Sequence, residues 1–119
     1  MSTVYPENVW RVAVTATKPN PGTEAKQIVM IPEWVTDLTL YVKGSAAASA
    51  KIEESPSSGV AIHTGAPAPD WMSVDATLDS VGTTMVRYAL GDRTPVALRV
   101  SSLVDNQTAT LIVVGKRTA

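Results

Sequence analysis

The segment Asp37–Lys43, DLTLYVK, alternates apolar side chains with polar or amphipathic ones at successive positions. Successive side chains of a β-strand point to opposite faces, so this period of two is typical of a half-buried strand. Gly44-Ser45 follows directly and ends the alternation. The apolar face, which we expect to lie in the core, consists of Leu38, Leu40 and Val42.

The same period of two recurs along the chain on both sides of this segment. The predicted strands are Val9–Ala16, Gln27–Ile31, Asp37–Lys43, Ala48–Glu54, Thr83–Leu90, Val96–Ser102 and Thr108–Val114. The side chains expected to point inward are Trp10, Val12, Val14, Ala50, Ile52, Val86, Tyr88, Leu90, Val96, Leu98 and Val100. In Ala48–Glu54, the alternation places Ser49, Lys51 and Glu53 outward.

Short strands separated by turn residues are typical of antiparallel sandwiches and barrels. We therefore predict an all-β fold, a single-domain antiparallel β-sandwich of about seven to nine strands, either jelly-roll or Ig-like. The domain is expected to span residues 9–115, after an N-terminal arm at residues 1–8 and before a flexible C-terminal tail at residues 116–119. No helix of three turns is predicted.

The last two predicted strands are separated only by the polar turn Asp105-Asn106-Gln107 and a few flanking residues, which favours a terminal hairpin. Within the second of them, the run Leu111–Val114 is apolar on both faces. A strand of this kind is either central and covered on both sides or partly buried against another subunit.

Two segments depart from the strand pattern. The alanines Ala46–Ala48 have high helix propensity, so a short helical turn competes with the strand there. Ser55–Asp70 is rich in proline and glycine, and only Val60–Ile62 within it could form a short strand. Long irregular segments in compact domains are usually functional or mobile. Ser55–Asp70 is therefore the first place to expect a contact with a partner.

Composition narrows the classes of function. The 119 residues are 45% hydrophobic and 18% charged, with a formal net charge of -1 and no cysteine. Because the basic residues are spread along the chain, nucleic acids and acidic membranes are not expected partners. No run approaches the roughly 20 apolar residues that span a bilayer. Without cysteine, thiolate zinc sites and thiol nucleophiles are excluded.

Few residues are candidates for catalysis. His63 is the single histidine, and metal sites or catalytic triads require further partners, so we interpret it as a loop residue. A Ser-His-Asp set remains compatible with the serine content, but no Gly-x-Ser-x-Gly elbow is present. We therefore predict a protein that is not an enzyme, with no catalytic, cofactor-binding or metal-binding residues and no cofactor.

Several carboxylates and one glycosylation-like triplet have simple structural interpretations. Asp70, Asp75 and Asp79 could collect a calcium ion, but they lack the dense spacing of calcium loops and are interpreted as turn acids. Glu53-Glu54 cannot act as a glycosidase pair, because adjacent strand residues point to opposite faces. Asn106–Thr108 matches an N-glycosylation acceptor and is interpreted as turn chemistry.

Aromatic and small side chains indicate binding. The aromatic residues that could form a sugar-stacking platform are Trp10, Trp34, Trp71, Tyr5, Tyr41 and Tyr88. Packing in the core or an interface is the simpler interpretation for Trp10 and Trp34. For Trp71, which follows the proline-rich segment, packing and sugar stacking both stay open. The small side chains expected on outward faces are Ala13, Ala97, Ser101 and Ala109. Such faces are readily desolvated against another protein.

The C-terminal part of the chain carries a resemblance to a known family. After Trp71, it has a Gly-Thr-Thr strand, the run Thr94–Val100, a short polar turn and the run Thr108–Gly115. This pattern resembles the C-terminal half of small tailed-bacteriophage virion proteins of the head decoration, or cement, type. The resemblance implies a β-sandwich that binds the outside of an assembled capsid as an oligomer, often a trimer, and it brings no catalytic residues.

The expected function is therefore a structural virion protein that binds the major capsid protein or another virion protein and stabilises the capsid. On this hypothesis, the arm Met1–Glu7 and the segment Ser55–Asp70 bind neighbours. The location is the capsid surface, after synthesis in the host cytoplasm. The alternatives are a carbohydrate-binding module using Trp71 and Tyr88, or a tail or baseplate component of the same kind of virion.

Overall fold

A computed structural model describes residues 9–19 and 26–117 of the chain. The predicted arm at residues 1–8 and the final residues 118–119 lie outside the described residues. The strands are β1 (Val9–Thr17), β2 (Lys26–Met30), β3 (Val35–Gly44), β4 (Ala50–Ser55), β5 (Met72–Ser73), β6 (Val86–Ala89), β7 (Ala97–Ser102) and β8 (Thr108–Arg117). The helices are α1 (Gly59–Thr64) and the 3-10 helix η1 (Ala76–Leu78).

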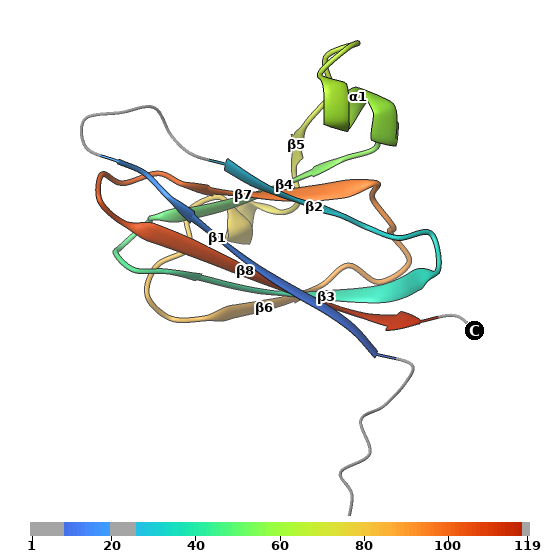
Figure 1. Ribbon diagram of the computed structural model, residues 1–119. Helices are drawn as coiled ribbons and strands as arrows, with labels where there is room; N and C mark the ends of the chain where they lie inside the picture. The colour runs from blue at the N-terminus through green and yellow to red at the C-terminus, as the bar shows by residue number, and fades with distance from the viewer. Residues whose placement is uncertain (1–8, 20–25, 118–119) are drawn as a thin grey trace, which may run out of the picture.

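The strands form two four-stranded sheets packed face to face (Figure 1). Sheet A has the order β1-β8-β3-β6, and sheet B has the order β2-β7-β4-β5. All of the pairings are antiparallel. The predicted antiparallel β-sandwich is therefore confirmed, and its strand number lies within the predicted range.

The pairings are nested, because β1 pairs with β8, β2 with β7, β3 with β6, and β4 with β5. A long antiparallel hairpin folded across two sheets produces this nesting, and it defines the eight-stranded jelly roll. The topology therefore decides between the two predicted sandwich types in favour of the jelly roll.

The core lies between the two sheets. Leu40 and Val42 are fully buried, and Leu38 is 1% exposed, as the alternation in Asp37–Lys43 predicts. The buried apolar cluster also contains Ala16, Val29, Val35, Ala50, Ile52, Val74, Leu78, Val81, Leu90, Leu98, Val100, Ala109, Leu111 and Val113. The partly buried side chains that pack against it are Trp10, Val12, Val14, Ile31, Val86 and Tyr88.

The prediction of a terminal hairpin is wrong. β7 pairs with β2 and β4 in sheet B, whereas β8 pairs with β1 and β3 in sheet A. Residues 103–107 carry the chain from one sheet to the other, with Asn106 at a positive φ of 62°. Strand alternation fixes which side chains face the core, but it does not fix the neighbouring strand.

β8 is central in sheet A, but the described chain covers only one of its two apolar faces. Leu111 and Val113 are fully buried, whereas Ile112 and Val114 on the opposite face are half-buried. The strand also runs on to Arg117, with Lys116 paired to Val9 and Thr36. The predicted end of the domain at residue 115 was therefore two residues too early.

The predicted short strand Val60–Ile62 is wrong, because this segment lies in α1. The Ser58 hydroxyl accepts from the Ala61 N–H at 3.2 Å, and Gly65 ends the helix at a φ of 73°. Serine is a favoured N-cap and glycine a favoured residue just after a helix, so the signal was present in the sequence.

The alanines Ala46–Ala48 form a turn between β3 and β4 rather than a helix, and Ala48 has a positive φ of 50°. Ser49 was predicted to point outward, but it is buried. Its hydroxyl donates to the Ala46 carbonyl at 2.7 Å, which closes the turn. Ser49 therefore belongs to the turn before β4, whereas Ala50 and Ile52 within the strand are buried as predicted.

A substitution at Gly115 tests the packing of β8 against β3. An alanine Cβ at this position would collide with Val35 and lie 2.9 Å from Leu38 Cδ2. We expect Gly115→Ala to lower the free energy of unfolding by about 1–3 kcal/mol through overpacking, measured by denaturant unfolding. The control is Gly82→Ala, where the nearest atoms lie 3.9 Å away. Equal stability of the two variants would contradict the packing described here.

Candidate interaction site

The segment between β4 and β5 rises above sheet B and carries α1 at its tip (Figure 1). Val60 on this helix is 68% exposed, the largest exposed fraction among the exposed large hydrophobic residues of the described chain. The segment is held to the sandwich through Ser57, whose N–H donates to the Ser55 hydroxyl at 3.1 Å. Its two ends are joined because the Asp70 N–H donates to the Ser57 hydroxyl at 2.9 Å. The segment thus presents an apolar side chain on a fixed projection.

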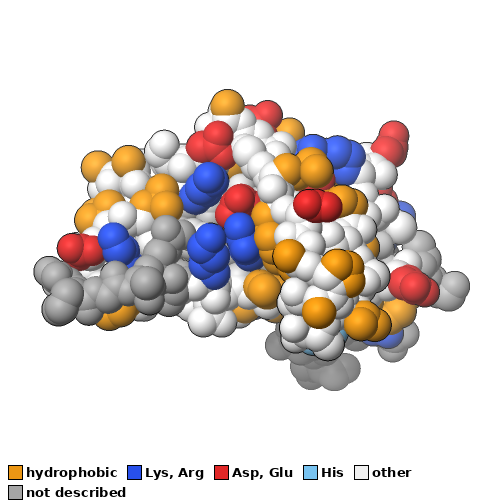
Figure 2. Space-filling model, turned by 90° about the horizontal axis from the view of Figure 1, so that it is seen from above, with side chains coloured by type: hydrophobic (Ala, Val, Ile, Leu, Met, Phe, Trp, Pro, Cys, Tyr) orange, Lys and Arg blue, Asp and Glu red, His pale blue; other side chains and the backbone are white. Residues whose placement is uncertain are grey.

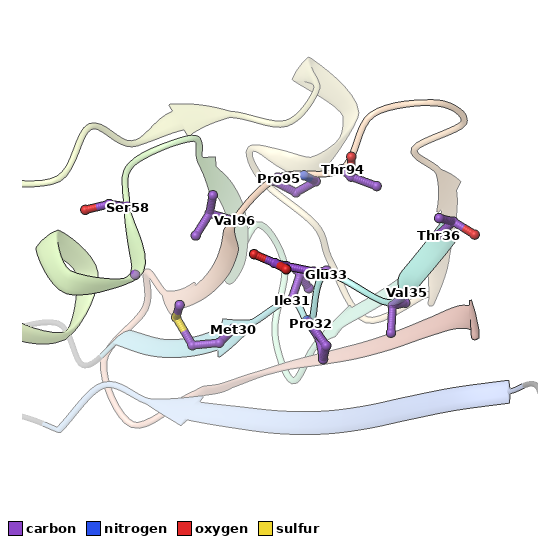
Figure 3. A pocket seen from close by; sticks show the side chains of 11 residues that line it. Met30, Ile31, Pro32, Glu33, Val35, Thr36, Ser58, Thr94, Pro95 and Val96 are labelled. Carbon is purple, nitrogen blue, oxygen red and sulfur yellow. The ribbon is translucent and has the colours of Figure 1, made fainter. Parts of the chain in front are cut away.

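A cavity of about 610 Å³ lies beside the start of α1 (Figure 3). It is lined by the end of β2 and the β2–β3 turn, by Ser58-Gly59, and by the segment that leads into β7. The lining residues are Met30, Ile31, Pro32, Glu33, Val35, Thr36, Ser58, Gly59, Thr94, Pro95 and Val96. The Met30 side chain points toward α1 in this view.

Glu33 is the single ionisable residue among those lining the cavity, and its carboxylate points toward Val96 in Figure 3. The Ser58 hydroxyl already accepts a hydrogen bond from the Ala61 N–H in the first turn of α1. The arrangement suits an apolar side chain with a positively charged end, because the lining is mainly apolar and includes one exposed carboxylate.

A second hollow of about 340 Å³ lies on the other side of the segment Thr94–Val96. Its wall contains Arg93, whose Nη1 lies 3.1 Å from Glu54 Oε2. Arg93 Nη2 also donates to the Val74 carbonyl and the Tyr88 hydroxyl, each at 3.4 Å. One guanidinium therefore joins three separate segments at this end of the sandwich. The sequence pattern does not indicate this role of Arg93.

The outer face of sheet B contains a half-buried ion pair. Arg99 Nε donates to Glu53 Oε1 at 2.9 Å, and the guanidinium lies 4.3 Å from the centre of the Trp71 ring. The two charged side chains are only 17% and 13% exposed. Figure 2, which views the molecule from above sheet B, shows basic and acidic side chains gathered in the middle of this face, beside hydrophobic ones. Partial burial strengthens such a pair relative to an exposed one.

The aromatic residues do not form one platform within the described chain. One face of Trp71 is taken by Arg99, whereas Tyr88 packs against the core from sheet A. Trp10 also packs against the core, as predicted. Trp34 is 43% exposed at the far end of the sandwich, where Arg117 lies 4.8 Å from its ring centre. Tyr5 lies outside the described residues.

Three of the four small residues predicted on outward faces are buried, and only Ala13 is exposed. Ala109 lies in the core, because it shares the inward face of β8 with Leu111. Ala97 and Ser101 do lie on the outer side of sheet B. Ala97 pairs with Ser55, where the α1 segment is fastened, and Ser101 pairs with Lys26 and Lys51.

Among residues 9–19 and 26–117, no three His, Asp or Glu side chains come together in a way that could hold a metal ion. Asp75 caps η1, and Asp79 accepts from the Ser73 hydroxyl at 2.5 Å, so these two carboxylates serve local turns. Asp70 and His63 are exposed, and His63 lies in α1 rather than in a loop. Glu53 and Glu54 point to opposite faces of β4, as predicted. They bind different arginines, Arg99 and Arg93. Asn106 is an exposed turn residue, also as predicted.

Comparison with known proteins identifies no relative, because no protein-family model and no curated protein matches the sequence. Within the described part of the chain, no helix has the length and apolar character needed to cross a membrane.

The α1 projection depends on its two end residues. We expect Ser58→Ala and Gly65→Ala each to destabilise the helix locally by about 1 kcal/mol, through the lost cap and through strain at positive φ. Hydrogen exchange of the Ile62 and Gly65 amides should accelerate several-fold, while exchange of core amides in β8 is unchanged. His63→Ala is the control. An equal acceleration in β8 would show that α1 is part of the cooperative core instead.

Asp75 provides a second test. Hydrogen bonds from the Thr77 hydroxyl and the Thr77 N–H hold the pKa of this carboxyl below its ordinary value. The ionised form is favoured in the folded state, so the contribution to stability is present above the ordinary pKa of about 3.9. It is lost as the pH falls through the lower pKa of the folded state. Thr77→Val should move the pKa upward in an NMR titration, and an unchanged titration would contradict the assignment.

Proposed function

We propose that this chain is a non-catalytic structural protein of a bacteriophage virion, a decoration or cement protein that binds and stabilises the assembled capsid. It acts at the capsid surface, after synthesis in the host cytoplasm. Its partners are the major capsid protein or another virion protein and further copies of itself, arranged as a homo-oligomer such as a trimer. The exposed Val60 on the α1 projection, beside a cavity with a mainly apolar lining, is the observation that carries this proposal.

Fold and sequence pattern support the proposal as analogies. Jelly rolls occur in viral capsid domains and in lectins, but a fold hosts many functions. The resemblance of Trp71–Arg117 to head decoration proteins favours the virion. The location of α1 agrees with the expectation that Ser55–Asp70 binds a neighbour.

The physical basis of attachment would be burial of apolar surface by a preorganised projection. Because α1 is capped at both ends and Ser57 fastens its segment to β4, little conformational freedom is left to be lost on binding. A cavity beside the projection can receive a side chain from the neighbour. Rigid contacts of this kind add to the shell's stability in each copy that is bound.

Val60→Asp tests the proposed contact. The wild-type protein should co-sediment with purified capsids that have been stripped of it, and the variant should bind at least about tenfold more weakly. The control is Ala47→Asp, which adds the same charge at an exposed turn between β3 and β4. Circular dichroism checks the fold of both. Wild-type protein that stays in the supernatant would refute capsid binding, whereas equal binding of the variants would remove α1 from the contact.

The alternatives predict other results. A tail or baseplate component would be present in purified virions at a low copy number relative to the major shell protein. A carbohydrate-binding module would bind a glycan array in a manner abolished by Trp71→Ala. This module is less well supported, because Arg99 covers one face of the Trp71 ring and Tyr88 packs against the core.

A further inference from the structure

The outer face of sheet A differs from the outer face of sheet B. Sheet A forms the lower layer in Figure 1, and no described helix or loop lies beneath it. In the strand pairing of sheet A, Ile112 lies between Ala13 and Tyr41. Two residues further along β8 on the same face, Val114 lies beside Thr39. These side chains are exposed or half-buried. The middle of the face is therefore apolar and uncovered by the described chain.

Four basic residues surround this apolar centre. Arg11 lies on β1, Lys43 on β3, Arg87 on β6 and Lys116 on β8, and all four are exposed. Within residues 9–19 and 26–117, none of the four makes a salt bridge. The single carboxylate in these four strands is that of Asp37, which lies at the bulge of β3. The sheet A face, defined as these outward positions of β1, β8, β3 and β6, thus carries unpaired positive charge.

We infer that the sheet A face docks onto a protein surface that has an apolar centre flanked by aspartate and glutamate. If the proposed function holds, on which this inference rests, that surface belongs to the capsid shell. Interfaces combine an apolar core with a charged rim, and complementary charge directs the partners together. A face whose charges are all unmatched is complementary to carboxylates.

The size of the face fits such a complex. The strands β1, β8, β3 and β6 have 9, 10, 10 and 4 residues. At about 3.3 Å per residue and about 4.8 Å between strands, they cover about 500 Å². Docking would then bury about 1,000 Å² on the two partners together, which is the size of small, transient interfaces.

Other occupants fit less well. Two copies of this face would oppose like charges, which disfavours a face-to-face dimer. Nucleic-acid interfaces are much more positively charged and more polar than an Ile, Val, Tyr and Ala surface. The formal net charge of -1 also provides no general attraction to phosphate.

The experiment compares two double charge reversals. Arg11→Glu/Arg87→Glu alters opposite edges of the sheet A face, and Lys26→Glu/Lys51→Glu makes the same change of net charge on the outer side of sheet B. Binding to stripped capsids is measured by co-sedimentation at several salt concentrations, after circular dichroism has confirmed the fold. We expect the first variant to bind more than about tenfold more weakly at low salt, and the second to bind within about twofold of wild type. Lys43→Glu/Lys116→Glu replaces the first variant if that one does not fold.

Each outcome decides a separate point. If the wild type binds and the sheet A variant binds equally well, or if both variants are weakened alike, the inference is overturned while the proposed function stands. If the wild type does not bind capsids, both fall. Wild-type binding to a double-stranded DNA fragment that is lost in the sheet A variant, or self-association lost in that variant, would assign the face to those occupants and overturn the inference.

Discussion

The position of β8 between β1 and β3 is the constraint on which the rest of the structure depends. β8 is the last strand, yet it lies inside sheet A and pairs along its length with the first strand. Sheet A is therefore completed only when β8 pairs with both β1 and β3. Leu111 and Val113 then fill the space against sheet B, and their complete burial makes this closure favourable. Gly115 permits the close approach of β8 to Val35 and Leu38 at the start of β3.

The sequence predicted which residues face the core better than it predicted which strands are neighbours. Leu38, Leu40 and Val42 are buried because a period of two is a local property of one strand. Pairing depends on contacts between distant segments, so residues 103–107 could equally have formed a hairpin turn or a crossing between sheets. The helix α1 could have been predicted, since Ser58 is a favoured N-cap and Gly65, seven positions later, a favoured C-cap.

The candidate site was only partly predictable for the same reason. The segment Ser55–Asp70 was identified by its composition, but the cavity joins residues from β2, the β2–β3 turn and the approach to β7, which the jelly-roll topology alone brings together. Arg93 was not singled out because its partners lie on β4, before η1 and on β6. Likewise, the burial of Ala97 and Ser101 depends on what covers sheet B, and alternation carries no information about that layer.

The two sheets differ in whether the arginines on their outer faces are paired, and this difference gives the molecule two unlike sides. On sheet B, Glu53 neutralises Arg99, Trp71 stacks on the guanidinium, and the α1 segment lies over one end. On sheet A, the cations of Arg11 and Arg87 remain in water beside a half-buried Ile112. Charges that are already paired gain little from a partner, whereas unpaired charges around an apolar surface gain both electrostatic and hydrophobic stabilisation when a complementary surface excludes water. The two proposed contact surfaces, α1 and the sheet A face, therefore lie on opposite sides of the jelly roll (Figure 1).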